Sequence, residues 1–156
     1  GSILLLERNA LASAASSQAA GMILQVSANS TRTAMARMTR ETIDILADEL
    51  GQEVGFHNVG SLRLAASDGR VAQLEAMAAE AARHDIPFHW LEPKAAEDLV
   101  PWLDTSQARK IGFLPDDGYV DPYMLSMAYA RAAGGQFLSP PETAIKQDLR
   151  RFRCHK

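Results

Sequence analysis

The chain has 156 residues, of which 47% are hydrophobic, and a formal net charge of −3. This length suffices for a domain with a real core, and the slightly acidic balance argues against a nucleic-acid or anionic-membrane partner. No apolar run reaches the roughly 18 residues of a membrane span. Cys154 is the single cysteine, so no disulfide can form within the chain, and a reducing compartment, the cytoplasm, is expected.

The first predicted element is an apolar strand at residues 3–6, followed at once by Glu7. In a dinucleotide-binding βαβ unit, an acid at the end of the second strand accepts hydrogen bonds from the ribose. The Gly-rich turn that binds the pyrophosphate belongs roughly 20 residues before such an acid, and the sequence contains no G-x-G-x-x-G. Taken alone, residues 3–7 are better explained by an ordinary buried strand with a solvated end than by a dinucleotide-binding strand.

The stretch from Ser13 to Gly21 combines small residues with hydroxyl groups. Small side chains let a planar ligand or a phosphate approach the backbone, and hydroxyls and free N–H groups bind phosphate oxygens. A flexible Ser/Ala loop, or the small-residue face of a packed helix, explains the same composition. When this stretch is considered alone, either of these explains it better than a ligand-binding segment does.

Apolar spacing and capping residues predict four helices, at about residues 31–50, 68–84, 94–99 and 122–133. Gly51 ends the first helix, and Asp121 and Pro122 begin the last. The first helix is predicted to face the core with Met35, Met38, Thr42, Ile45 and Leu46. The second is predicted to do so with Val71, Leu74, Ala78, Ala81 and Ala82.

Strands are predicted between these helices, at residues 59–65, 87–91 and 110–114, with a weak last strand at 136–138 or 143–145. The tripeptide Asp116-Asp117-Gly118 is typical of a turn. This order of elements predicts an interrupted α/β fold of mixed α+β character.

Five motifs follow one another along the chain: LLLER at 4–8, SSQAAGM at 16–22, VGFHNVGSLRLA at 54–65, LVP at 99–101 and LPDDGYVDP at 114–122. In this order they resemble the D-amino-acid oxidase superfamily of FAD-dependent oxidoreductases, especially its sarcosine and dimethylglycine dehydrogenases and oxidases. The resemblance implies a partial Rossmann-like FAD-binding domain at 1–54, which lacks the Gly-rich first turn. A substrate-domain portion, with residues 56–65 as one of its strands, follows at 55–117, and a truncated return to the FAD-binding domain at 118–156.

The resemblance also implies which residues would contact FAD: Glu7, Arg8, Ser16, Ser17, Gln18, Ala20, Gly21 and Met22. The first two would lie at the adenosine, the next three along the pyrophosphate and flavin ring, and the last three close to the isoalloxazine. In the dehydrogenase branch a histidine often stands at the position of Gln18 and is bonded covalently to the flavin. Glutamine cannot form that bond, so noncovalent FAD is expected.

The reaction of the family is the oxidation of a secondary or tertiary amine, such as sarcosine or dimethylglycine, by hydride transfer to flavin N5. Most substrate-contacting positions of the family would lie beyond residue 156, so the resemblance predicts ancestry rather than turnover by this chain. The residues themselves show no nucleophile–base pair and no metal motif, and His57, His84 and His89 are predicted to be surface or packing residues.

Two alternatives remain open from the residues. The chain could be a non-catalytic remnant that binds a partner, or forms a homo-oligomer, through exposed apolar faces and the unpaired edge of the strand at residues 3–6. It could also be part of a nicotinamide-binding Rossmann domain, which Glu7 fits and the Ser-Ser-Gln-Ala-Ala-Gly stretch does not.

Overall fold

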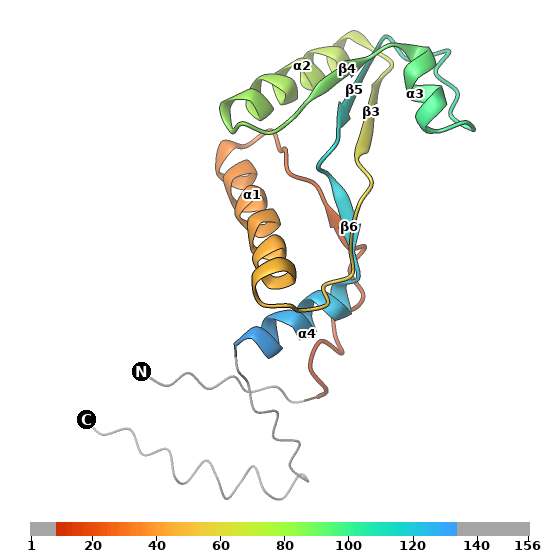
Figure 1. Ribbon diagram of the computed structural model, residues 1–156. Coiled ribbons are helices and arrows are strands. Elements are labelled where there is room, and N and C mark those ends of the chain that lie inside the picture. Colours follow the sequence, from red (N-terminus) through yellow and green to blue (C-terminus); the bar gives the residue numbers. More distant parts are fainter. Residues whose placement is uncertain (1–8, 134–156) are drawn as a thin grey trace, which may run out of the picture.

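The computed structural model describes residues 9–133, which form two small antiparallel sheets arranged end to end and flanked by helices (Figure 1). The strands are β1 (Met22–Ile23), β2 (Phe56–Asn58), β3 (Ser61–Ala65), β4 (His89–Leu91), β5 (Lys110–Leu114) and β6 (Gly118–Val120). The helices are α1 (Ser30–Asp44), its π-helical continuation η1 (Ile45–Glu49), α2 (Asp68–Arg83), α3 (Pro93–Leu99) and α4 (Pro122–Ala132). The predicted mixed α/β class is confirmed, while the predicted strands at 3–6 and at 136–138 or 143–145 lie outside the described residues.

The first sheet has the order β1-β6-β2, with β6 antiparallel to both neighbours. Its inner face packs against α1, η1 and α4 through a core formed by Ile43, Leu46, Val54 and Ala128, with Ile23 and Phe56 at its margin. α4 begins where it was predicted, because the Asp121 carboxylate accepts hydrogen bonds from the first backbone N–H groups of the helix.

The second sheet has the order β3-β5-β4 and is covered by α2. Its core joins Ala81 of α2 to Leu114 of β5, with Val26 and Ile86 completing the cluster. The predicted apolar face of α2 is largely confirmed, since Leu74 and Ala81 are buried, although Ala82 is exposed. None of the helices within residues 9–133 is long and apolar enough to cross a bilayer.

One bent two-stranded ribbon connects the two sheets. β2 and β3 form one arm, β5 and β6 the other, and the first sheet holds β2 and β6 while the second holds β3 and β5. The single strand expected over residues 56–65 is therefore wrong: it breaks at Gly60, whose φ of +74° suits glycine. A side chain there would collide with the Phe113 ring. The ribbon crosses the expected domain boundary at 117/118, between β5 and β6, and the domain division stays a prediction.

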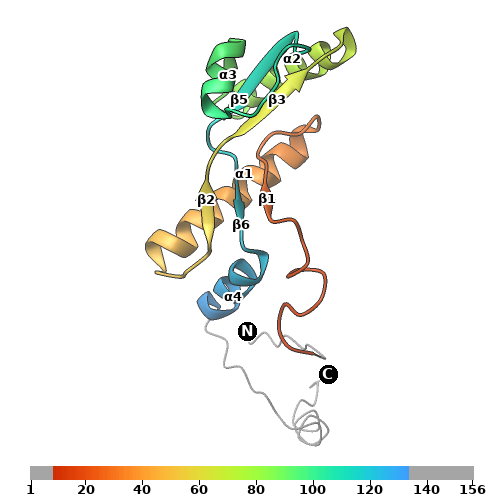
Figure 2. The same ribbon diagram turned by 90° about the vertical axis from the view of Figure 1, so that its right-hand side faces the viewer.

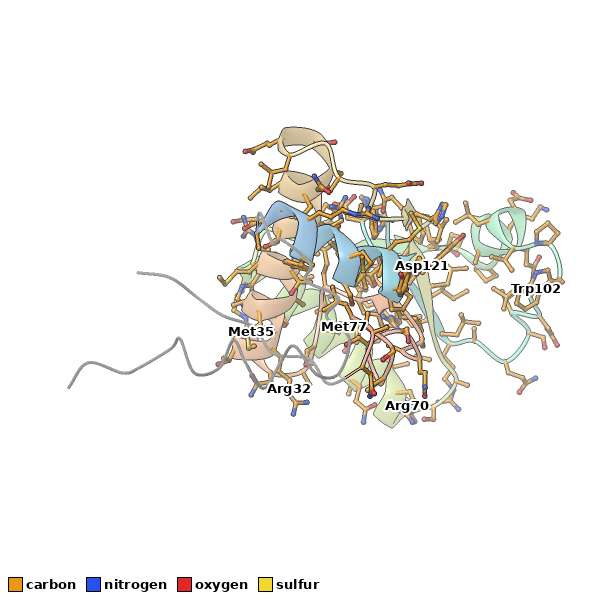
Figure 3. All side chains as sticks on the ribbon, turned by 90° about the horizontal axis from the view of Figure 1, so that it is seen from below. Arg32, Met35, Arg70, Met77, Trp102 and Asp121 are labelled. Carbon is orange, nitrogen blue, oxygen red and sulfur yellow. The ribbon has the colours of Figure 1, made fainter. Side chains whose placement is uncertain are left out.

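The buried side of α1 differs from the predicted one. Met35 and Met38 are 62% and 64% exposed, and Met35 lies on the side of α1 that faces away from the sheets (Figure 3). Thr33 is fully buried instead, because its hydroxyl bonds the backbone of the preceding loop. The π-helical turn then shifts the register of the helix, which leaves Ile45 exposed and turns Leu46 inward.

Candidate cofactor-binding site

The predicted flavin contacts from Ser16 to Ala20 lie on a surface segment made of consecutive turns. The backbone N–H of Gln18 donates to the Ala15 carbonyl at 3.3 Å, and the Ser17 hydroxyl donates to the Ala14 carbonyl at 3.1 Å. Ser16 and Gln18 are exposed, and within residues 9–133 their side chains have no hydrogen-bond partner. Glu7 and Arg8 lie outside the described residues.

This segment fits the polar part of a dinucleotide. The Ser16 hydroxyl and the Gln18 amide are available to phosphate or ring acceptors. Ala19 and Ala20 are also exposed and carry only a methyl group, so they leave room for a planar ring to approach the backbone. The donor set and the small side chains therefore fit the expected FAD.

Gly21 ties this segment to the first sheet. Its φ of +70° is left-handed, and its carbonyl accepts a 2.8 Å hydrogen bond from the backbone N–H of Val120 in β6. A Cβ at this position would collide with the Val120 carbonyl oxygen. The glycine is therefore required by the approach of two backbones, and it holds the turns of residues 16–20 at one end of β1.

A buried carboxylate, Asp117, organises the region behind β1, at a position where the sequence predicts only a turn. Asp117 is fully buried and accepts hydrogen bonds from the Gln25 backbone N–H at 2.9 Å and the Ser61 hydroxyl at 2.6 Å. The Arg63 guanidinium lies 3.5 Å from the same carboxylate. The turn is present as expected, but Asp117 also joins the segment after β1 to β3. The neighbouring Asp116 has no such partner among the described residues, and nothing local distinguishes the two acids in the sequence.

The histidines within residues 9–133 do not form a catalytic relay. His84 Nε2 lies 2.8 Å from the Ser30 hydroxyl and 3.0 Å from a carboxylate oxygen of Glu80. In a Ser-His-acid triad the acid holds the other ring nitrogen, so these contacts fasten the start of α1 to the end of α2. His57 stacks on Tyr119. Residues 9–133 contain no group of three or more metal-ligating side chains.

Comparison with known proteins places the whole arrangement in one family. The family model described as FAD dependent oxidoreductase, DAO, matches residues 1–154. Mitochondrial dimethylglycine dehydrogenase of Homo sapiens is 29% identical over 148 residues, which are 92% of this chain and 17% of that protein. The 4-methylaminobutanoate oxidase (formaldehyde-forming) of Paenarthrobacter nicotinovorans is 32% identical over 130 residues, 83% of this chain and 16% of that protein.

A solved structure gives the same result. Glycine oxidase from Geobacillus kaustophilus superposes with a TM-score of 0.65 at 29% identity, over 78% of this chain and 35% of the other. The chain thus spans less than a fifth of the two sequence relatives and about a third of this solved structure. The resemblance stated from the five motifs is confirmed, and the chain belongs to the DAO family of FAD-dependent oxidoreductases.

Proposed function

We propose that this chain supplies part of the cofactor site of an oxidoreductase that binds FAD noncovalently and oxidises small secondary or tertiary amines. The observation that carries the proposal is the exposed, hydroxyl-bearing turn segment at residues 16–20, held against the first sheet by Gly21 in a chain of an FAD-dependent family. Dimethylglycine and 4-methylaminobutanoate, the compounds that the names of the two relatives contain, are both N-methylated amino acids. Sarcosine, dimethylglycine and related compounds are accordingly the proposed substrate class.

FAD, when bound, supplies the chemistry of the reaction by accepting a hydride at flavin N5. The residues of this chain bind and orient. The Ser16 and Ser17 hydroxyls would donate to pyrophosphate oxygens, and the Gln18 amide would hydrogen-bond beside the ring without a covalent link. Glu7 would accept from the ribose hydroxyls and Arg8 would lie near the adenine.

The domain division belongs to the same proposal. Residues 1–54 and 118–156 would contribute to the FAD-binding domain, and residues 55–117 to the substrate domain. The proposed compartment is the cytoplasm, as expected for a chain with one cysteine. Self-association through exposed apolar faces belongs to the alternative, a non-catalytic remnant without flavin.

The visible spectrum of the purified protein, before and after incubation with FAD and desalting, tests the cofactor assignment. A retained flavin band that acid denaturation releases into the supernatant is the expected result. A band that stays with the precipitated protein would contradict noncovalent binding, and a folded protein that remains colourless would overturn the proposal. Anaerobic addition of sarcosine or dimethylglycine to this chain is expected to leave the band unbleached, since most substrate-contacting positions of the family would lie beyond residue 156.

A further inference from the structure

An apolar stripe lies on the outer face of the helix formed by α1 and η1. Met35, Met38 and Ile45 are 62%, 64% and 42% exposed, and their spacing of three and seven residues keeps them on one side of the helix. Figure 1 shows α1 at the margin of the described structure, and Figure 2 shows it behind β1, β6 and β2. We call these three residues the outer stripe.

The charges of this helix are sorted along its length. From the start of α1 to Arg40 it has three arginines and no acid, and from Glu41 to the end of η1 it has four acids and no base. This order opposes the helix macrodipole, which favours acids near the N-terminus and bases near the C-terminus. The internal ion pairs Arg37–Glu41 and Arg40–Asp44 also place the base first, the less favourable order. The sorting of charge therefore does not stabilise the helix itself.

The charges nearest the two ends are left without counter-ions. Arg32, Asp48 and Glu49 are exposed and form no ion pair with any residue from 9 to 133. An identical helix packed antiparallel would bring the basic half of each copy beside the acidic half of the other and would oppose the two macrodipoles. Such an interface is isologous, because each copy contributes the same face.

The outer stripe fits the same antiparallel arrangement. With a two-fold axis level with residue 40, Met35 of each copy lies level with Ile45 of the other, and Arg32 lies level with Asp48. Apolar side chains then meet along the middle of the interface and opposite charges toward its ends. Unbranched methionines adapt readily to such a surface.

We propose that the outer stripe is the surface through which two copies of this chain associate, with their α1 and η1 helices packed antiparallel. The inference goes beyond the proposed function and does not depend on FAD. One helix of about 30 Å from each copy buries less than a standard interface of about 1,200–2,000 Å². The dimer should accordingly dissociate on dilution.

Sedimentation equilibrium of the 156-residue chain over a dilution series measures this association. Met35→Gln keeps the length and helix propensity of the side chain and removes an apolar contact twice in the symmetric dimer. It should raise the dissociation constant at least about 5-fold. Leu99→Gln is the matched control, since Leu99 is a similarly exposed apolar residue of α3 outside the stripe, and should leave the constant unchanged.

Arg32→Glu tests the charge argument separately from folding. An acid in the first turn of α1 suits the macrodipole, so urea unfolding should show no loss of stability. The same change opposes Asp48 of the second copy with a like charge, and should weaken association about 2- to 5-fold at low salt and not in about 1 M NaCl. Arg70→Glu makes the same change at the third residue of α2 and should not affect association.

Cysteine cross-linking in a Cys154→Ser background tests the direction of packing. A mixture of Met35→Cys and Ile45→Cys chains should form a disulfide-linked dimer on mild oxidation. Met35→Cys alone should not, because in the antiparallel pair its two copies lie about 15 Å apart along the helix. Efficient cross-linking of Met35→Cys to itself would refute the antiparallel arrangement.

Two other results overturn the inference altogether. One is a chain that stays monomeric up to millimolar concentration, which would mean that no second copy covers the stripe. The other is a dimer whose dissociation constant is the same in Met35→Gln and Leu99→Gln, which would place the interface elsewhere. The visible flavin spectrum is read independently of sedimentation, so either result leaves the proposed FAD site standing.

Discussion

Replacing Asp117 with alanine tests whether one buried carboxylate connects the two sheets. The substitution leaves the Gln25 backbone N–H and the Ser61 hydroxyl without their acceptor, and the Arg63 guanidinium without its counter-charge. Asp117 itself is fully buried, so water does not reach the site unless the structure opens.

The expected loss follows from these three groups. A buried donor left unsatisfied costs about 1–3 kcal/mol, and two neutral donors are affected here. The Arg63 side chain is 27% exposed, so solvent makes its share smaller than that of a fully buried ion. Removing one partner of a buried charged pair costs about 3–5 kcal/mol, and we expect Asp117→Ala to fall in that range. Asp117→Asn keeps one acceptor oxygen and should cost less.

Urea unfolding, followed by far-UV circular dichroism, measures these differences. With an m-value of about 2 kcal/mol/M for a small protein, the midpoint of Asp117→Ala should fall by about 2 M. Asp116→Ala is the matched control, since the Asp116 side chain has no hydrogen-bond partner among the described residues. Its free energy of unfolding should change by less than about 0.5 kcal/mol. The reasoning is refuted if Asp117→Ala and Asp116→Ala unfold at the same urea concentration.

Four further predictions concern single positions. Gly21→Ala should lower the free energy of unfolding by about 2–4 kcal/mol, because the residue is left-handed and its Cβ meets the β6 backbone. Gly69→Ala, in the first turn of α2 with open space around it, should instead raise it by up to about 1 kcal/mol in the same urea assay. Asp121→Ala removes the cap of α4 and should cost about 0.5–2 kcal/mol, with lost helicity in the dichroism spectrum and no loss in Asp121→Asn. The backbone N–H and then the hydroxyl of Ser106 lower the pKa of the exposed Asp104 carboxyl. An NMR titration should therefore find the pKa of Asp104 below its usual value. Any stabilisation from this carboxyl is present above the pKa that Asp104 has in the unfolded chain, and it is lost as the pH falls through the lower pKa of the folded protein. A pKa in Ser106→Ala equal to that of the unsubstituted protein would show that the hydroxyl makes no contribution.

Elements that are specified by neighbouring residues were predictable from the sequence. α4 starts at Pro122 because Asp121 and Pro122 are a local capping signal, and the structure shows the carboxylate bonding two backbone N–H groups. The strand Lys110–Leu114 has the predicted bounds, since its apolar run is closed by a turn sequence that immediately follows. The resemblance of five ordered motifs to the DAO family was also within reach, because each motif is short and local.

Features that depend on distant partners were not predictable in the same way. β1 has two residues and β6 three, too few for an alternating pattern, and both exist because they pair with each other across the chain. The buried side of α1 was assigned by hydrophobicity, yet the helix buries Thr33 and rests Arg40 on the Phe56 ring at 4.3 Å, while two methionines face outward. Tertiary contacts outweighed the apolar pattern there.

The candidate site shows the same division within one short sequence. Asp116-Asp117-Gly118, directly before Tyr119, is predicted to be a turn, and local chemistry supports no more than that. In the structure Asp117 joins the segment after β1 to β3, and Gly118 lets β2 approach, since a Cβ there would collide with the His57 carbonyl oxygen. Tyr119 is exposed and stacks on His57. Because a turn needs none of these three properties, the burial of Asp117 and the exposure of Tyr119 both have to come from the ribbon that places β6 between β1 and β2. The same ribbon holds the turns of residues 16–20 against β6 through the pairing of β1, so the candidate site is assembled by strand pairing across about a hundred residues rather than by any single motif.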